Sequence, residues 1–305
     1  MSSRRRRTRQ SGSVPPVRPP SRRVFVAYLL AWAVTAMGCS RPSEDYGLVG
    51  VRPYKYGESP SQIGELTVPN RLGPHPVVVL IHGGWWRAED FDRTAMRELA
   101  RAISAEGFAA WNLEYRLVGE PGGGWPGTFE DVARGIDALR EHAPTENLDL
   151  GRVVVVGHSA GGHLALWAAK RSDLPPGAPG ASPKVVPKAV VALNPITDLA
   201  AAAEANLGGG AVQQLMGGPP SAHPERYALA SPSRLLPLPV PQRLFHATRD
   251  PVVPVEQSRR FVAAAQTAGS DAVLVELDDS THFDVIAPDR PSWKKVESLL
   301  KQILS

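Results

Sequence analysis

The segment VVVVGHSAGGHLALWAA, residues 153–169, places a polar serine among small residues. The four valines before it are typical of a buried strand, and an apolar helical pattern begins directly after it. GHSAG fits the pattern G-x-S-x-G, which exposes a strained serine hydroxyl when it joins a strand to a helix. Gly157 and Gly161 remove the Cβ atoms that would clash in such a turn. We therefore predict that Ser159 is a nucleophile, and the alternative is a glycine-rich turn with an incidental serine.

A serine that attacks a carbonyl needs hydrogen-bond donors for the oxyanion that forms. The N–H group of Ala160 would lie at the start of the predicted helix, where backbone donors are free. A second glycine pair, Gly83-Gly84 in LIHGGWWR (80–87), directly follows a predicted strand. Two glycines there would let backbone N–H groups face a ligand. We expect this loop to supply further oxyanion donors, and the alternative is an ordinary turn at the end of a strand.

An acid and a histidine follow the serine in the order Ser, Asp, His. Asp250 in FHATRDPVVP (245–254) comes just after a predicted strand, and His282 lies in the polar loop DDSTHFD (278–284). The histidine could accept the serine proton, and the carboxylate could orient the imidazole. The alternatives are a helix N-terminal acid for Asp250, a solvated loop histidine for His282, and Asp198 as the orienting acid. We interpret His158 as turn packing and His163 as a helix residue near the pocket floor.

The elements that must position these residues alternate between strands and helices. Continuous apolar strands between amphipathic helices predict an α/β fold with a mostly parallel sheet that is covered on both faces. A capping-box-like pair, Thr128 and Asp131, opens one of the helices. The segment 198–238, rich in Pro, Gly and Ala, is interpreted as a lid-like insertion. The predicted strands are 76–82, 108–116, 152–157, 188–195, 242–247 and 272–277, and the predicted helices are 92–107, 128–143, 160–170, 255–268 and 291–300.

The charge is unevenly distributed along the 305 residues. The formal net charge is +4, from 34 basic and 30 acidic residues, but residues 1–38 hold eight arginines and no acid. Subtracting those eight leaves 26 basic against 30 acidic residues, a net charge of −4. Nucleic-acid binding requires a basic folded domain, so no nucleic-acid partner is expected. No cluster has metal-ligand spacing, and no metal or cofactor is predicted.

The N-terminal segment has the pattern of an export signal. SRRVFVAYLLAWAVTAMGCS, residues 21–40, joins a basic region to an apolar run that is short for a membrane span. SRRVFV resembles a twin-arginine signal, and AMGC, ending at the single cysteine Cys39, resembles a lipobox. We predict an export signal over 1–39 with Cys39 lipidated, a tether over 40–50, a domain over 51–305, and a location in a bacterial cell envelope or outside the cell. The alternatives are a plain signal peptide or an uncleaved anchor.

These motifs together resemble the α/β-hydrolase superfamily, in particular its carboxylesterase and kynurenine-formamidase-like branch. HGGWW, WNLEYR, GHSAGGH, HATRDPVVP and THFD occur in the family order over about residues 60–304. The resemblance implies an α/β-hydrolase fold with a catalytic triad of Ser159, Asp250 and His282 and an oxyanion hole of Gly83, Gly84 and Ala160. Trp85 stands where related HGGG loops have a third glycine, which favours the formamidase-like side. Trp85, Trp86 and Trp125 could line the substrate pocket or pack against neighbouring loops.

Three functions remain open at this point. The first is a serine hydrolase that cleaves a small carboxylic ester through an acyl-enzyme. The second is amide chemistry in the same site, as in an arylformamidase. The third is a non-catalytic binding module on a hydrolase scaffold, because a fold does not by itself define a function. A missing triad member would be typical of the third, and all three members have candidates.

Overall fold

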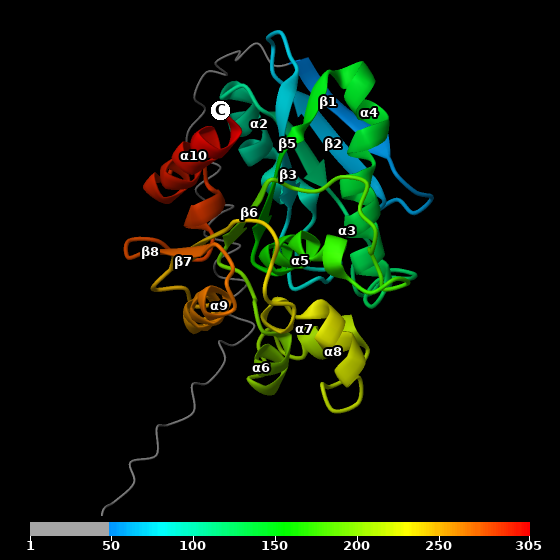
Figure 1. Cartoon of the computed structure of the whole chain (residues 1–305), viewed down its shortest axis with the longest axis vertical. Coiled ribbons are helices and arrows are strands. Elements are labelled where there is room, and N and C mark those ends of the chain that lie inside the picture. The colour runs from blue at the N-terminus through cyan, green and yellow to red at the C-terminus, as the bar shows by residue number, and fades with distance from the viewer. Residues whose placement is uncertain (1–48) are drawn as a thin grey trace, which may run out of the picture. The chain divides into compact units, whose positions relative to one another are not determined.

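The computed structural model describes residues 49–305, which contain one eight-stranded mixed sheet (Figure 1). The strand order is β1-β2-β4-β3-β5-β6-β7-β8; β1 and β2 pair antiparallel with their neighbours, and the pairs from β4 to β8 are parallel. The predicted mostly parallel sheet is confirmed, whereas the two antiparallel strands at its edge were not predicted. The strands are β1 Val49–Lys55, β2 Ile63–Val68, β3 His75–Ile81, β4 Ala109–Leu113, β5 Leu148–His158, β6 Ala189–Leu193, β7 Gln242–Ala247 and β8 Ala272–Leu277.

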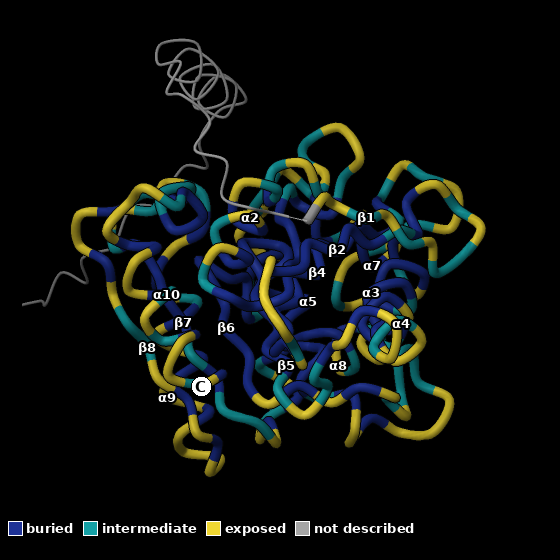
Figure 2. The backbone as a smooth tube through the Cα atoms, turned by 90° about the horizontal axis from the view of Figure 1, so that it is seen from above, coloured by how far each residue is buried: buried dark blue, intermediate teal, exposed yellow. Residues whose placement is uncertain are grey.

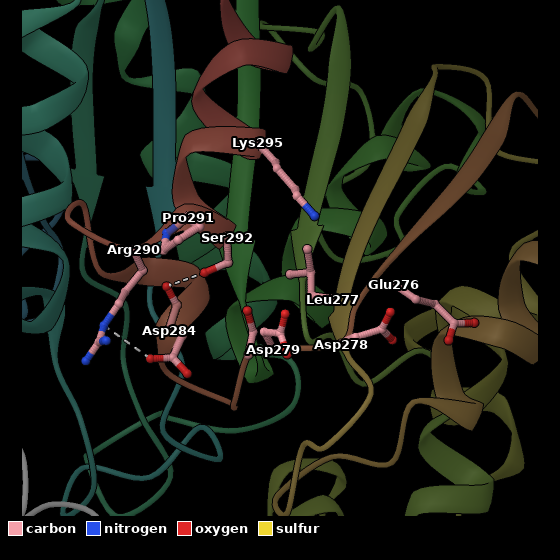
Figure 3. Close-up of a pocket in the computed structure, with 10 residues that line it drawn as sticks. Glu276, Leu277, Asp278, Asp279, Asp284, Arg290, Pro291, Ser292 and Lys295 are labelled. Atoms are coloured by element: carbon pink, nitrogen blue, oxygen red, sulfur yellow. Dashed lines mark hydrogen bonds and ion pairs between the residues drawn. The ribbon is translucent and has the colours of Figure 1, made fainter.

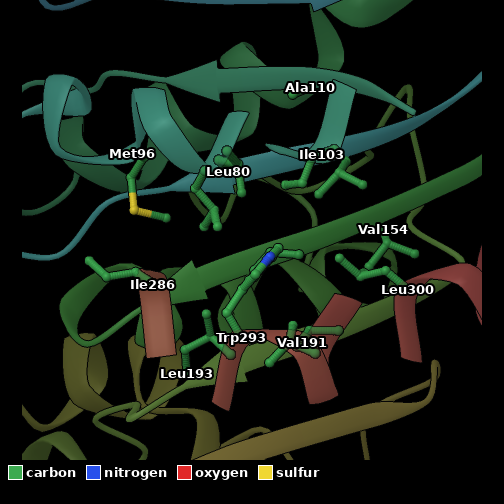
Figure 4. Close-up of a cluster of buried hydrophobic side chains, with 14 of the residues drawn as sticks. Leu80, Met96, Ile103, Ala110, Val154, Val191, Leu193, Ile286, Trp293 and Leu300 are labelled. Carbon is green, nitrogen blue, oxygen red and sulfur yellow. The ribbon is translucent and has the colours of Figure 1, made fainter. Parts of the chain in front are cut away.

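Two helices, α2 and α10, cover one face of this sheet (Figure 1). Alternate strand residues such as Val78, Val154 and Val191 point to this face, because successive side chains of a strand alternate between faces. They pack in one apolar cluster with Ile103 of α2 and Trp293 of α10 (Figure 4). The helices are α2 Arg97–Ala105, α3 Gly127–Asp137, α4 Leu139–Glu146, α5 Ala160–Ala169, α6 Leu199–Glu204, α7 Ala211–Met216, α8 Pro224–Ala230, α9 Glu256–Thr267 and α10 Pro291–Leu304.

Helices α3, α5 and α9 cover the opposite face. Trp111 of β4 points away from the α2–α10 side, and its indole N–H donates to Gly135 O of α3 at 2.8 Å. His246 of β7 likewise lies 2.7 Å from Ser258 Oγ of α9. All ten residues of α5 are buried, which explains why this helix is apolar on every side apart from His163 (Figure 2). A helix buried in this way holds its first turn, which follows Ser159, in a fixed position.

The predicted helix 128–143 is wrong in its continuity and in its capping box, whereas its start lies within one residue of the observed Gly127. Helix α3 ends at Asp137 and α4 begins at Leu139, where Glu141 N donates to Ala138 O in a tighter 3₁₀-type turn. Thr128 and Asp131 form no capping box. The Thr128 hydroxyl donates to Arg116 O, and the Asp131 carboxylate accepts from the Arg116 guanidinium. These long-range partners engage both side chains, so neither caps the helix.

The segment 198–238 contains α6, α7 and α8 and a 3₁₀ turn, Pro232–Arg234. It touches the loops that follow the parallel strands. Trp125 N donates to Leu215 O at 2.7 Å, and Arg87 Nε donates to Gln214 Oε1 at 2.7 Å. We call this segment the cap, and it lies against the loops that follow β3 and β4.

The predicted export signal, including Cys39, lies outside the described residues, as does the predicted tether except at its last two positions. Strand β1, the first described element, begins at Val49, within the last two positions of the predicted tether. Among residues 49–305, no helix has the length and apolar character needed to cross a bilayer.

Candidate active site

Ser159 lies in the turn between β5 and α5 with φ 55° and ψ −117°, a conformation that is strained for a residue with a side chain. Its N–H donates to Leu193 O of β6 at 2.8 Å. The glycines around it permit the turn. A Cβ on Gly161 would lie 2.1 Å from Ile81 O, and one on Gly157 would lie 2.1 Å from Gly161 O. Close backbone packing therefore holds the strained serine in place.

His282 and Asp250 are brought together across 32 residues of sequence. His282 Nδ1 lies 2.6 Å from Asp250 Oδ2, and both side chains are almost completely buried. Asp250 Oδ1 also accepts from the N–H groups of Val252 and Val253, at 2.7 and 2.9 Å. Burial opposes ionisation of Asp250, but the charge and hydrogen bond of His282 and the Val253 N–H outweigh it and lower the carboxyl pKa. Because a carboxylate only accepts, Nδ1 carries the proton and a neutral His282 has Nε2 free to act as a base.

His158 joins the serine turn to the histidine loop. Its Nε2 lies 2.8 Å from His282 O, which also accepts from Asn194 Nδ2 at 2.9 Å. The His158 and His282 rings lie 4.7 Å apart. Burial and then the neighbouring His282 lower the pKa of His158 to about 3. His158 is therefore neutral, and it donates to the histidine loop in addition to the packing role that the sequence suggested.

The glycine loop after β3 lies directly against the serine. A Cβ on Gly83 would be 3.1 Å from both His158 O and Ser159 Cβ. Gly84, Trp85 and Trp86 have φ values of 99°, 52° and 58°, so three successive residues are left-handed. The loop thus curls tightly beside the start of α5. The three predicted oxyanion donors, the N–H groups of Gly83, Gly84 and Ala160, belong to these two adjoining segments.

The three tryptophans predicted at the pocket pack between loops, helices and the cap. Trp86 is completely buried and lies edge-on to His163, with ring centroids 5.2 Å apart. Trp125 is half-buried against Phe129, with centroids 5.1 Å apart. The Trp85 ring closely approaches Gly208 of the cap. Trp86 matches the packing alternative, whereas Trp125 keeps an exposed part.

The rival acid, Asp198, has a different role in this structure. Its carboxylate accepts from Ala201 N at 3.1 Å and caps α6. Its own N–H donates to Gln257 Oε1 at 2.8 Å. Of the two predicted acids, Asp250 is the one that contacts His282.

A hollow lies beside the loop that carries His282 (Figure 3). Asp284 anchors this loop: its carboxylate accepts from Thr281 N and the Thr281 hydroxyl, both at 2.7 Å, and it pairs with Arg290 at 3.5 Å. Ser292 Oγ of α10 donates to Asp284 O at 2.9 Å. The hollow is lined by four acidic side chains, yet residues 49–305 contain no group of His, Cys, Asp or Glu side chains suited to holding a metal ion. Asp284, the last residue of the THFD motif, therefore anchors this loop.

The sheet order and the serine turn between β5 and α5 define an α/β-hydrolase fold. The structure superposes on esterase B from Lactobacillus rhamnosis with a TM-score of 0.74 at 23% identity, over 92% of this chain and 94% of that one. A family model, BD-FAE, matches residues 66–264, and the chain belongs to this family.

Two curated relatives carry names of different activities. Esterase LipC of Mycobacterium tuberculosis is 26% identical over 264 residues, which are 81% of this chain and 64% of LipC. Kynurenine formamidase avaC of Aspergillus versicolor is 26% identical over 262 residues, which are 73% of this chain and 85% of avaC. The chain thus spans less than two thirds of the length of LipC.

Proposed function

We propose that this protein hydrolyses a small carboxylic ester through an acyl-enzyme formed on Ser159. The observation that carries the proposal is the 2.6 Å contact between His282 Nδ1 and Asp250. His158, which precedes the strained Ser159, donates to the backbone of the loop that holds His282. The similarity to LipC and the BD-FAE family membership support the ester as substrate class.

In the first half of the reaction, Ser159 Oγ attacks the ester carbonyl and His282 Nε2 takes its proton. The imidazolium that forms is stabilised by the Asp250 carboxylate, whose lowered pKa keeps it ionised. The N–H groups of Gly83, Gly84 and Ala160 receive the oxyanion. His282 then gives its proton to the leaving alcohol, and the acyl group stays on Ser159.

In the second half, water takes the place of the alcohol. His282 Nε2 removes a proton from the water as it attacks the acyl-enzyme, and the same donors hold the second oxyanion. Return of the proton to Ser159 Oγ releases the acid. Neutral His158 adds no positive charge beside the imidazolium, which keeps the proton transfer to His282 favourable.

Hydrolysis of a formamide is the second candidate, and the similarity to avaC favours it. The chain covers a larger share of avaC than of LipC. The same residues would act, except that His282 would protonate an amine leaving group.

The test is a comparison of substrates in the wild type and Ser159→Ala. We expect turnover of p-nitrophenyl acetate or butyrate in preference to N-formylkynurenine, and a loss of at least about a thousandfold in Ser159→Ala, as expected when a triad member is removed. Preference for N-formylkynurenine would instead identify the second candidate.

Ser104→Ala is the matched control, because Ser104 is a buried serine of α2 whose hydroxyl has no partner. It should keep full activity. A Ser159→Ala protein that is folded and as active as the wild type would exclude the acyl-enzyme, and a folded wild type inactive on every substrate would favour a binding module.

We also propose that the chain is exported and anchored to a bacterial membrane by a lipid on Cys39. The proposal rests on the sequence of residues 21–40, with its arginine pair, apolar run and AMGC. The active site would then act on substrates outside the cytoplasm.

A further inference from the structure

Two adjacent residues that follow β4, Glu114 and Tyr115, contact the glycine loop beside Ser159 and hold it in place. The Tyr115 hydroxyl donates to His82 O at 2.9 Å, and the Tyr115 ring stacks on the His82 ring with centroids 4.5 Å apart. His82 Nε2 lies 2.7 Å from Glu114 Oε1, and His82 Nδ1 lies 2.8 Å from Gly83 O. The carbonyls of two successive loop residues are thus both fixed.

The partners of His82 determine its protonation. A carbonyl oxygen and a carboxylate oxygen only accept hydrogen bonds, so both ring nitrogens of His82 donate. A ring with two N–H groups is an imidazolium cation. The His82 side chain is completely buried and that of Glu114 is 4% exposed, so the cation and its carboxylate form a buried ion pair.

The surrounding charges agree with this assignment. Glu114 Oε2 accepts from Arg93 N at 2.9 Å and lies 3.4 Å from Arg93 Nη1, so its second oxygen is also occupied. Burial disfavours the charged form of His82, but the charge and hydrogen bond of Glu114, the Gly83 carbonyl and Asp92 outweigh it and raise the His82 pKa. Burial opposes ionisation of Glu114, but the charge and hydrogen bond of His82 and the N–H groups of Arg93 and Tyr115 outweigh it and lower the carboxyl pKa.

The fixed carbonyls set the direction of the oxyanion donors. In a trans peptide the C=O of one residue and the N–H of the next point to opposite sides. The bond from Tyr115 to His82 O therefore orients Gly83 N–H, and the bond from His82 Nδ1 to Gly83 O orients Gly84 N–H. A charged donor on Gly83 O also polarises the Gly83–Gly84 peptide and strengthens its N–H as a donor.

We propose that Glu114, His82 and Tyr115 are positioning residues of the oxyanion hole, in which a buried imidazolium at position 82 orients and polarises the Gly83–Gly84 peptide. This inference rests on the proposed hydrolysis at Ser159. It assigns a function to Glu114 and Tyr115 of the WNLEYR motif, which lie more than 40 positions before the serine.

The test is Glu114→Gln, which keeps the shape of the side chain and removes its charge. Without the anion, His82 should lose one ring proton at neutral pH. We expect kcat at pH 7.5 to fall about 10- to 100-fold with KM changed less than about threefold, as a misdirected oxyanion donor weakens binding of the transition state alone. In the wild type we expect kcat to fall at alkaline pH, where His82 deprotonates. In Glu114→Gln this fall should occur at lower pH.

Nitrogen-15 NMR of the imidazole rings supplies a readout that does not depend on activity. In the wild type at pH 7.5 we expect both His82 nitrogens to be protonated, and in Glu114→Gln only one. A neutral His82 in the wild type would overturn the proposal even where Glu114→Gln does not fold. Because this readout needs no turnover, it separates failure of this inference from failure of the proposed function, which Ser159→Ala tests.

Glu65→Gln is the matched control. Glu65 is a buried glutamate that pairs with Arg93 and Arg97 in the same ionic network but does not touch His82. It should leave kcat and its pH profile unchanged, and Tyr115→Phe should lower kcat without altering the protonation of His82. Equal kcat losses and equal pH profiles in Glu65→Gln and Glu114→Gln would mean that the network acts on stability only, which would overturn the proposal.

Discussion

At the scale of single residues, the serine turn depends on glycines at which a side chain has no space. Gly161 lies against the backbone carbonyls of Ile81 and His82, and these belong to the strand end that leads into the glycine loop. Since backbone atoms cannot rotate away as a side chain can, a methyl group there would push α5 away from β3.

Gly161→Ala is therefore expected to lower the free energy of unfolding by about 3 kcal/mol, at the upper end of the cost of overpacking. It should also lower kcat, because displacement of α5 moves Ala160 N–H away from the oxyanion. Urea unfolding and ester hydrolysis check both effects. Gly50→Ala is the control, since a Cβ there meets nothing within 4 Å; equal stability of the two variants would contradict the steric argument.

At the scale of elements, α5 connects the serine turn to the cap. His163 Nε2 lies 3.0 Å from Ala230 O, and Trp167 Nε1 donates to Leu229 O at 3.1 Å, so two residues one turn apart bind the end of α8. Because a carbonyl only accepts, His163 Nε2 carries a proton, whereas the buried Nδ1 has no hydrogen-bond partner. Burial lowers the pKa of His163 to about 4.

The lowered pKa of His163 makes the cap contact sensitive to acid. The unfolded chain binds a proton near pH 6.5 and the folded chain only near pH 4, so this contribution to stability is full above pH 6.5 and is lost as the pH falls toward 4. We expect His163→Gln to reduce the slope of unfolding free energy against pH by about 1.4 kcal/mol per pH unit in this window. Urea unfolding between pH 7 and pH 4.5 measures it.

Trp167→Phe provides the control for this slope. It removes the neighbouring hydrogen bond to α8 without removing a titrating group, so stability should fall equally at every pH. If His163→Gln keeps the wild-type slope, His163 is not held neutral by the fold.

At the scale of the whole molecule, the basic residues of the first 38 positions contrast with the acidic remainder. Such a contrast sets the N-terminal segment, for which export is proposed, apart from the rest of the chain. The proposed anchor makes a prediction that depends on one atom, the sulfur of Cys39.

When the chain is produced in a bacterium with twin-arginine export, we expect the wild type in the membrane fraction with a lipid-sized mass increase on Cys39. Cys39→Ser should lack the added mass and should not undergo lipid-dependent processing. Fractionation followed by mass spectrometry of the N-terminal peptide checks this. An unmodified Cys39 in the mature wild type would exclude the lipid anchor.

The sequence alone determined the features that local signals encode. Apolar runs and helical periodicity predicted the parallel strands and most helices, and the spacing around Ser159 predicted the turn. The order of the motifs then selected Asp250 and His282, which the structure brings to 2.6 Å of each other. The strand, helix and turn predictions succeed because these preferences depend on residues close in the chain.

The tertiary structure alone decided the contacts that support the site. The antiparallel edge strands lack a strong local pattern, and Thr128 and Asp131 bind Arg116 instead of capping a helix. The bond from His158 to the His282 loop spans 124 residues and the His82–Glu114 pair spans 32. Burial determines such partners, because an ionised or polar group that is removed from water needs a hydrogen-bond partner. The fold can supply that partner from any part of the sequence.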